Sequence, residues 1–317
     1  MLKLVIVGTG IIVNSHIKGI EQLNDCELVA VCDINEEKAK ACAETCNVPY
    51  FLDYREIPSQ VDFDAVILNL PHGLHCEVSE FFLNSGKHVL VEKPMANTVE
   101  ECDRMIAAAK KNNKKLAIAH VQRYLGSIQT VKYFYDSGEL GKLCMYTENR
   151  TVNYFDEKRP RWFLDKKLAG GGPVMNFGAH ALDKLFSVMG DVNITSLNAQ
   201  CGNYKNNYTI EGHAQIFAKF DNGVTASLTF SGYTSAGYEA YYYFTNGALK
   251  VMNRHIEINR GLGNGFEPID PKNEDTAFAE EIDAFHKYIK GEPSNIPDGE
   301  YGKKIIKTIE SIYENLV

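Results

Sequence analysis

The sequence lacks long apolar runs, long basic runs and closely spaced cysteine pairs. No apolar stretch approaches the roughly 18 residues that a membrane-spanning helix needs. No run of Lys or Arg exceeds two residues and the net charge is −8, unlike the basic patches of proteins that bind nucleic acid or anionic membranes. We therefore expect neither nucleic acid nor a membrane among the partners of this protein.

The eight cysteines are scattered along the chain, and none belongs to a CxxC pair. This spacing argues against zinc-binding and small disulfide frameworks, so we expect reduced, buried thiols and no metal. The N-terminal run Leu2–Val7 reaches Gly8 too soon to form the apolar region and cleavage site of a signal peptide. The predicted location is therefore cytoplasmic.

The length of 317 residues, 44% of them hydrophobic, favours two folded domains, because one domain typically takes about 150 residues. Up to about residue 120, short apolar runs alternate with amphipathic segments, which indicates a parallel sheet flanked by helices. Thr98 and Glu101 have the spacing of a capping box, and Gly86 ends a helix expected over Glu77–Ser85. The strands predicted in this part are Leu2–Val7, Glu27–Cys32, Ala65–Leu70, His88–Val91 and Leu116–Ala119.

The second part of the chain is richer in hairpin signals. Turn residues at 221–223 and 246–247 each separate β-rich runs and predict antiparallel hairpins, most clearly between residues 213–220 and 224–230. Two helical segments close the chain, because apolar residues recur at helical spacing. We therefore predict an α/β protein, with a doubly wound parallel sheet in residues 1–120 and an α+β domain with a mainly antiparallel open sheet in residues 121–317.

Residues 8–10, Gly-Thr-Gly, follow the first predicted strand and precede a helical segment, as in the Rossmann phosphate-binding turn. Val13 stands where that motif has a third glycine or alanine. Asp33 lies 23 residues after Gly10 at the end of the second strand, where an acid binds the adenosine ribose hydroxyls. Alternatively, Asp33 caps a helix that begins near Glu36. No Arg follows Asp33 to pair with a 2′-phosphate, so NAD is favoured over NADP.

The triplet Glu92-Lys93-Pro94 follows a predicted strand, at the edge where open α/β sheets bind ligands. A lysine there can hydrogen-bond a reacting hydroxyl and stabilise the developing alkoxide, or relay a proton if its pKa is lowered. On these residues alone, a solvated surface lysine is the simpler interpretation.

The whole chain resembles the Gfo/Idh/MocA family of glucose-fructose oxidoreductase and inositol dehydrogenase. The resemblance rests on Glu92-Lys93-Pro94 and on residues 162–183, which match a W-x-x-D, A-G-G-G and D-x-G-x-H-x-x-D pattern in order and spacing. It implies a Rossmann domain followed by a substrate domain whose open sheet often packs against another subunit. It also implies hydride transfer between nicotinamide and a sugar or polyol carbon. One position departs, because Asn176 stands where the family often has an aspartate, and an amide cannot carry the hydroxyl proton.

The motifs and the resemblance together imply roles for individual residues. Lys93 and His180 are the implied catalytic pair, and Asp183 is expected to be structural. The implied cofactor residues are Gly8, Thr9, Gly10, Ile11, Ile12, Asp33, Asn69, Leu70, Pro71, His72, His75, Glu92, Lys93 and Arg123. The implied substrate residues are Lys93, Arg123, Tyr124, Asn153, Tyr154, Trp162, Asn176 and His180, with Arg161 as a further pocket residue. His72 and His75 have no further metal ligands clustered nearby, so no metal site is predicted there.

The preferred interpretation is an NAD-dependent dehydrogenase that acts on a secondary alcohol of a sugar, an inositol or a sugar derivative. Asn176 and Val13 leave a non-catalytic NAD-binding or sugar-sensing protein open. A redox-neutral enzyme that oxidises a sugar transiently on bound NAD is a further alternative. We also expect a homo-oligomer, a dimer or a tetramer, because few helical segments follow the hairpin-rich sheet to cover both of its faces.

Overall fold

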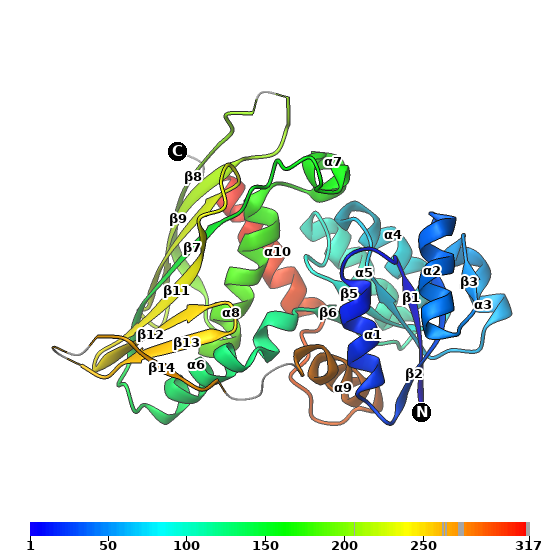
Figure 1. Cartoon of the computed structure of the whole chain (residues 1–317), viewed down its shortest axis with the longest axis horizontal. Coiled ribbons are helices and arrows are strands. Elements are labelled where there is room, and N and C mark those ends of the chain that lie inside the picture. Colours follow the sequence, from blue (N-terminus) through cyan, green and yellow to red (C-terminus); the bar gives the residue numbers. More distant parts are fainter. Residues whose placement is uncertain (206, 262, 264, 272–275, 315–317) are drawn as a thin grey trace. The chain divides into compact units, whose positions relative to one another are not determined.

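The chain divides into two units in the computed structural model, which describes all residues except 206, 262, 264, 272–275 and 315–317 (Figure 1). The first unit comprises Met1–Val121 and Thr276–Ile306, and the second comprises Gln122–Asp275 and Lys307–Val317. The division expected between residues 120 and 121 differs in one respect, because residues 276–306 return to the first unit. No local sequence pattern marks that return.

A six-stranded parallel sheet forms the centre of the first unit, in the order β3-β2-β1-β4-β5-β6. Every residue of β4 is buried, as expected for a central strand covered by helices on both faces (Figure 1). The order reverses between β1 and β4, the position at which doubly wound sheets bind ligands. The strands are β1 (Leu2–Val7), β2 (Cys26–Cys32), β3 (Tyr50–Phe51), β4 (Ala65–Leu68), β5 (His88–Glu92) and β6 (Leu116–Ala119).

The helices of the first unit begin and end largely where local signals place them. Thr98 Oγ1 accepts a hydrogen bond from Glu101 N at 3.2 Å, as the capping-box spacing predicts, and Glu101 Oε2 accepts one at 2.9 Å from the N–H of Asn97, the residue before the cap. Gly86 follows α4 with a φ of 77°. The helices are α1 (Val13–Glu21), α2 (Glu36–Cys46), α3 (Ile57–Gln60), α4 (His75–Asn84), α5 (Val99–Lys111), α9 (Ala277–Lys290) and α10 (Gly299–Glu314), whose last residues lie in the second unit.

An eight-stranded sheet forms the second unit, in the order β14-β13-β12-β11-β7-β10-β9-β8. Both predicted hairpins are present, β9 with β10 and β11 with β12, and the pair β7 with β10 is parallel. The strands are β7 (Leu143–Thr151), β8 (Ile194–Gly202), β9 (His213–Phe220), β10 (Thr225–Ser231), β11 (Gly237–Phe244), β12 (Gly247–Met252), β13 (His255–Asn259) and β14 (Glu267–Ile269). Its helices are α6 (Gly126–Ser137), α7 (Lys166–Ala169) and α8 (Ala179–Met189).

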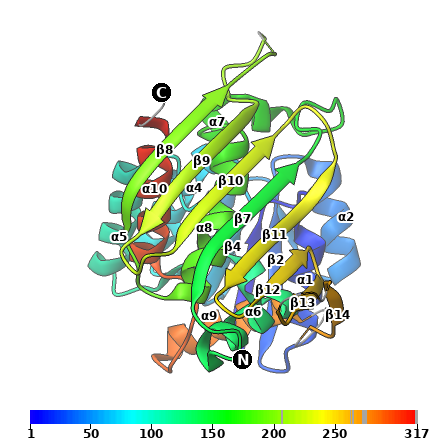
Figure 2. The same ribbon diagram turned by 90° about the vertical axis from the view of Figure 1, so that its left-hand side faces the viewer.

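The two faces of this sheet differ in burial. Along β9, buried residues alternate strictly with exposed ones, which is the period-2 pattern of a strand with one solvated face. Helices α6 and α8 lie on the buried side, and Figure 2 looks onto the other face, over which none of the described residues of the second unit forms a helix. The sheet therefore has one open face, as the sequence predicts.

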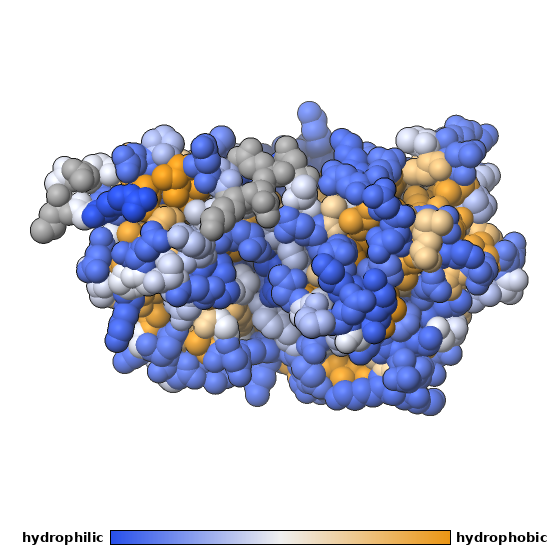
Figure 3. Space-filling model, turned by 90° about the horizontal axis from the view of Figure 1, so that it is seen from below, coloured by the Kyte–Doolittle hydropathy of each residue, from blue (hydrophilic) through white to orange (hydrophobic). Residues whose placement is uncertain are grey.

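The thiols and the surface complete the description of the fold. All eight cysteines are free, but the expectation that they are buried is wrong for Cys144, which is exposed, and Cys42, Cys46 and Cys201 are half-buried. Within the described part of the chain, no helix combines the length and apolarity needed to cross a bilayer. The surface seen in Figure 3 is mostly hydrophilic, with apolar residues in separate groups.

Candidate functional site

The loop between β1 and α1 lies against the ends of the neighbouring strands. Gly8 has a φ of 97°, and a Cβ there would lie 2.3 Å from the Asn69 carbonyl oxygen, so only glycine fits. Gly8 N donates to Cys32 O at 2.8 Å. A Cβ on Gly10 would meet no atom within 4 Å, which leaves open space beside the exposed end of the loop. The loop therefore has the tight turn and the open backbone that a phosphate-binding turn needs.

Asp33 holds this loop at the end of β2. Its Oδ2 accepts hydrogen bonds from Thr9 N at 2.8 Å and from Thr9 Oγ1 at 3.0 Å, and its Oδ1 accepts one from Asn35 N at 2.9 Å. The structure gives the capping role to Asn35, whose side chain accepts from Lys38 N at the start of α2. The carboxylate of Asp33 is thus not used as a helix cap and lies beside the glycine loop.

The loop after β4 contains a carboxamide without partners. Both polar side-chain atoms of Asn69 are buried and have no hydrogen-bond partner among the described residues. Because such groups cost free energy unless they are paired, this side chain fits a ligand that supplies a donor and an acceptor. Leu70 and Pro71 follow it, and the strand ends at Leu68, two residues before the predicted end.

His75 joins the loops that follow β4 and β5. Its Nδ1 lies 2.9 Å from Pro94 O and its Nε2 lies 2.9 Å from Leu70 O. Burial lowers the pKa of His75, although the two carbonyl oxygens raise it. Both ring nitrogens are occupied, so neither is left for a metal ion, and His75 acts as a support for the loops. His72 is buried next to it.

Lys93 lies directly after β5, next to a largely buried carboxylate. Glu92 Oε1 lies 3.0 Å from Nε2 of the buried His16, and Glu92 Oε2 accepts from Lys93 N at 3.1 Å. Burial raises the pKa of Glu92, but the hydrogen bond from His16 and the nearby Lys93 outweigh it and lower the pKa below its usual value. An ionised Glu92 therefore fixes the backbone at Lys93.

The first unit thus brings most of its predicted residues to one edge of the sheet. Residues 8–10, Asp33, Asn69 and Lys93 follow the carboxyl ends of β1, β2, β4 and β5, which are adjacent in the sheet. Within the loop after β1, Thr9 is buried, whereas Ile11 is 84% exposed and Ile12 is half-buried. This edge is where open α/β sheets bind their ligands.

In the second unit, Asn176 and His180 lie on one continuous helical segment. Asn176 is at the centre of a π-helical turn, Val174–Gly178, and His180 is at the start of α8. Such turns are rare and are frequent at functional sites. Asn176 and His180, which are four residues apart, therefore lie on one helical segment.

The glycines before this helix allow two side chains to approach its start. A Cβ on Gly171 would lie 2.0 Å from the Tyr313 hydroxyl, and one on Gly172 would lie 2.1 Å from the Glu211 carbonyl oxygen. The Glu211 carboxylate accepts hydrogen bonds from Gly172 N at 2.8 Å, from Val174 N at 2.7 Å and from Tyr313 Oη at 3.1 Å. Sequence analysis missed Glu211, which holds the helix that carries Asn176 and His180.

Tyr154 lies beside Asn176 in an aromatic cluster. It is fully buried, its ring packs against Phe163 and Phe177, and the guanidinium carbon of Arg159 lies 4.2 Å from its ring centre. Burial raises the pKa of Tyr154 far above its usual value, although Arg159 and the Asn176 amide lower it. Tyr154 is therefore protonated at neutral pH and supports Asn176.

Arg123 is buried and paired with Asp183. Arg123 Nε donates to Asp183 Oδ1 at 3.2 Å, and the two side chains are 10% and 1% exposed. This pair fits the structural role expected for Asp183, and the cofactor and substrate contacts of Arg123 stay predictions.

The other predicted substrate residues of the second unit differ in exposure. Tyr124 is buried, the exposed Asn153 donates to Asp156 at 3.3 Å, and Trp162 stacks on Phe163 with ring centres 3.7 Å apart. The exposed Arg161 starts the turn that carries Trp162. Their contacts with a substrate stay predictions.

A polar cluster that sequence analysis missed lies between α8 and the sheet. Lys184 Nζ pairs with Glu148 Oε2 at 2.8 Å and donates to Tyr238 Oη at 2.6 Å, with both members of the ion pair fully buried. Tyr146 Oη also donates to Glu148. Arg150 follows Glu148 on the same face of β7. The alternation of polar residues at 146, 148 and 150 is visible in the sequence, but it does not indicate what these residues do.

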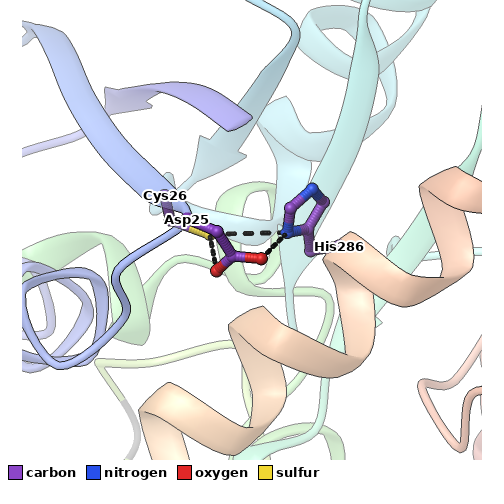
Figure 4. Close-up of side chains that lie close together, drawn as sticks. All are labelled: Asp25, Cys26 and His286. Carbon is purple, nitrogen blue, oxygen red and sulfur yellow. Dashed lines mark hydrogen bonds and ion pairs between the residues drawn. The ribbon is translucent and has the colours of Figure 1, made fainter. Parts of the chain in front are cut away.

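Asp25, Cys26 and His286 lie together in the first unit, where α9 approaches the start of β2 (Figure 4). His286 Nδ1 lies 3.0 Å from Asp25 Oδ2 and 3.9 Å from Cys26 Sγ. Burial, together with the Asp25 carboxylate, raises the pKa of the Cys26 thiol to about 12. These contacts join α9 to the start of β2.

Comparison with known proteins agrees with this geometry. The model described as "Oxidoreductase family, NAD-binding Rossmann fold" matches residues 2–120, and that described as "GFO/IDH/MocA C-terminal domain" matches residues 128–250. The chain is 26% identical over 352 residues to D-glucoside 3-dehydrogenase of Escherichia coli (strain K12), a match that covers 99% of this chain and 95% of that protein.

Two further relatives show how far the likeness extends. The chain is 34% identical over 181 residues to 1-carboxy-3-chloro-3,4-dihydroxycyclohexa-1,5-diene dehydrogenase of Comamonas testosteroni, which covers 57% of this chain and only 45% of that protein. The crystal structure of aldose-aldose oxidoreductase from Caulobacter crescentus, complexed with glycerol, superimposes with a TM-score of 0.88 at 24% identity, covering 99% of this chain and 97% of that one. At that identity the structural likeness shows the fold alone.

Proposed function

Because this chain belongs to the Gfo/Idh/MocA family of NAD(P)-dependent oxidoreductases, we propose that it transfers a hydride between NAD and a secondary alcohol of a sugar, an inositol or a sugar derivative. One observation carries the proposal: the glycine loop, Asp33, Asn69 and Lys93 meet at the carboxyl edge of the parallel sheet. The names of the relatives support the substrate class, since they include a glucoside dehydrogenase.

The residues at this edge fit a dinucleotide. The loop after β1 offers open space beside Gly10 to a pyrophosphate, and the unpartnered carboxamide of Asn69 offers a donor and an acceptor. The Asp33 carboxylate would accept hydrogen bonds from ribose hydroxyls and repel a 2′-phosphate, which favours NAD over NADP. Bound NAD supplies a carbon that takes up or releases hydride.

The proposed chemistry gives the proton transfer to His180 of the second unit and the charge stabilisation to Lys93 of the first. As the carbinol carbon loses hydride, its hydroxyl proton passes to His180 and the C–O bond becomes a carbonyl. The Lys93 ammonium stabilises the negative charge that develops on that oxygen. Asn176 can hydrogen-bond a hydroxyl but cannot take its proton, so His180 carries the base role without a neighbouring carboxylate.

The test uses the purified chain with NAD and a panel of polyols, aldoses and glycosides. We expect an absorbance rise from reduced nicotinamide with at least one of them. Product analysis accompanies it, because a redox-neutral cycle on bound NAD consumes substrate without net absorbance. NAD binding with neither turnover nor product contradicts the proposal and favours the non-catalytic, sugar-sensing alternative that Asn176 suggests.

The open face of the eight-stranded sheet supports a homo-oligomer. Met145 and Phe217, on β7 and β9, are 40% and 51% exposed, and Tyr241 and Tyr243 stack side by side on β11. An apolar and aromatic surface of this kind favours association with a second copy. Light scattering should give at least a dimer, and Phe217→Lys should weaken it. A monomer at micromolar concentration contradicts the proposal. The cytoplasmic location stays a prediction from the sequence.

A further inference from the structure

A small pocket in the second unit is lined by cations and by no carboxylate. Its volume is about 200 Å³. Strand β7, helix α8 and the turn between β12 and β13 each contribute one cation, Arg150, Lys184 and Arg254 respectively. The remaining lining residues are Gln122, Leu125, Ile128, Tyr238 and Asn253. The polar side chains that face this pocket are therefore hydrogen-bonding groups or positive charges.

The charge of Lys184 is balanced inside the protein, whereas that of Arg150 is not. Lys184 pairs with the buried Glu148, which lies behind the pocket wall. The guanidinium of Arg150 makes no ion pair with a carboxylate in the part of the chain that the structure describes. Its carbon lies 4.5 Å from the ring centre of Phe177 and 5.7 Å from that of Tyr238. Arg150 is thus held by aromatic stacking, with its hydrogen-bond donors unpaired by any acid.

This pocket lies close to the candidate catalytic helix. Lys184 is four residues after His180 on α8, which corresponds to about 6 Å along a helix axis. Phe177, under the Arg150 guanidinium, follows Asn176 directly in the π-helical turn. A six-membered sugar ring has a similar span, so a sugar with one end at His180 would reach the pocket wall at Lys184.

We propose that the substrate of this dehydrogenase is a sugar or polyol that carries an anionic group, a carboxylate or a phosphate ester, and that Arg150 selects it. This inference rests on the proposed function and narrows its substrate class. The planar guanidinium offers paired N–H donors that match two oxygens of either group. Gln122, Asn253 and Tyr238 supply the amide and hydroxyl groups that bind the neighbouring sugar hydroxyls.

The experiment compares anionic sugars with their neutral counterparts on the full chain with NAD. The panel contains hexoses, the corresponding uronates and the corresponding hexose 6-phosphates, and the uronate and phosphate arms distinguish the two anions. We expect kcat/KM at least 10-fold higher for one anionic class than for the neutral hexoses. Arg150→Met should raise KM for that class about 10- to 100-fold with little change in kcat, the range expected for a lost charge-assisted hydrogen bond. The kcat/KM for neutral hexoses should fall less than that for the anionic class.

Two variants control for charge and for packing. Arg260→Met removes an equal charge from an arginine that also lies over a ring, that of Phe134, but it pairs with Glu267 and does not line the pocket. It should leave the preference intact. Arg150→Lys keeps the charge and loses the planar fork, so it should retain part of the preference.

Calorimetric binding separates this inference from the proposed function. If the same uronates or hexose 6-phosphates bind the wild-type chain and bind Arg150→Met at least 10-fold more weakly, the anion site stands even when none of them is oxidised. The proposed hydride transfer is then the part that fails. Equal kcat/KM for neutral and anionic sugars overturns the inference, and so does anion binding that Arg150→Met leaves unchanged or the absence of any anion binding.

Discussion

The two units of this protein position their candidate residues by different means. In the first unit, the glycine loop, Asp33 and Lys93 follow directly after neighbouring strands, and short hydrogen bonds such as Thr9 N to Asp33 Oδ2 hold them. In the second unit, Arg150, Lys184 and Tyr238 come from β7, α8 and β11, and their placement depends on a buried ion pair and on ring contacts. A site built on strand ends leaves a local sequence pattern, whereas one built from packed side chains does not.

The largest expected effect tests the chemical role of the second unit. His180→Ala should lower kcat on an identified substrate by about 10²- to 10⁴-fold, because a positioned general base contributes that much. NAD affinity, measured by calorimetry, should be nearly unchanged, since the residues proposed for the cofactor's phosphates and ribose lie in the first unit. His255→Ala, at an exposed histidine of β13, is the control. An unaltered rate and pH profile removes His180 from the mechanism.

Lys93→Met, in the first unit, likewise tests whether a residue acts in the chemical step or in cofactor binding. Loss of the ammonium should lower kcat by about 10²- to 10³-fold, the usual effect of removing one group that stabilises a developing oxyanion. NAD binding should change only a few-fold, because Glu92 and the glycine loop remain. Lys111→Met, on the exposed end of α5, serves as the control. If NAD affinity collapses and kcat does not, Lys93 positions the cofactor instead.

The first unit was largely predictable from sequence because its candidate residues lie directly after strands. Its strand ends, glycine turn and acid follow one another at fixed spacing, so position along the chain indicates position in the sheet. The return of residues 276–306 to the first unit was not predictable, because an amphipathic helix such as α9 does not specify which core it covers.

In the second unit, the hairpins and the open sheet face were predictable, but most of the polar chemistry was not. Glu211 caps a helix through Gly172 and Val174, which lie 39 and 37 residues before it in the chain, a separation that no capping pattern spans. Likewise, Glu148 and Lys184 are 36 residues apart and pair only through the packing of α8 on β7. Such pairs form only when tertiary packing buries distant residues together, and local sequence patterns do not predict that packing.

Lys184→Met tests how strongly that burial holds the second unit. Removal of one partner of a buried ion pair leaves Glu148 uncompensated and should lower the free energy of unfolding by about 3 to 5 kcal/mol. Urea unfolding followed by Trp162, the single tryptophan of the chain, measures the effect in this unit. Lys132→Met breaks an exposed pair with Asp136 on α6 and should cost less than about 1 kcal/mol. If the two variants lose equal unfolding free energy, burial of the pair of Lys184 and Glu148 does not strengthen its contribution to stability.

Asp33→Ser tests whether the first unit sets the preference for NAD over NADP. The substitution removes the carboxylate that is proposed to repel a 2′-phosphate, so the preference for NAD over NADP should fall by about 10-fold or more. Calorimetric dissociation constants for both cofactors measure it. Asp62→Ser, at an exposed aspartate of the same unit, should leave the ratio unchanged. Equal or tighter binding of NADP by the wild-type chain rules out the role of Asp33.

The smallest expected effect is a difference between the two units in how their stability depends on pH. Burial acts on both Glu92 and Glu211, but the pKa of Glu92 is lowered by His16, whereas that of Glu211 stays raised despite its N–H donors. The folded first unit therefore favours ionised Glu92, so its contribution to stability is present above the ordinary glutamate pKa of about 4.3 and is lost as the pH falls below it. The folded second unit favours protonated Glu211, whose contribution is full below that value and is lost as the pH rises.

Glu92→Gln and Glu211→Gln measure this contrast by urea unfolding between about pH 3 and pH 7, a range that spans the ordinary glutamate pKa. The difference in unfolding free energy between the wild type and Glu92→Gln should shrink toward the acidic end. The unfolding free energy of the wild type minus that of Glu211→Gln should fall toward the neutral end, because the wild-type carboxyl must stay protonated or ionise in the folded state whereas the amide does not titrate. Slopes of the same sign for both variants contradict the opposite pKa shifts.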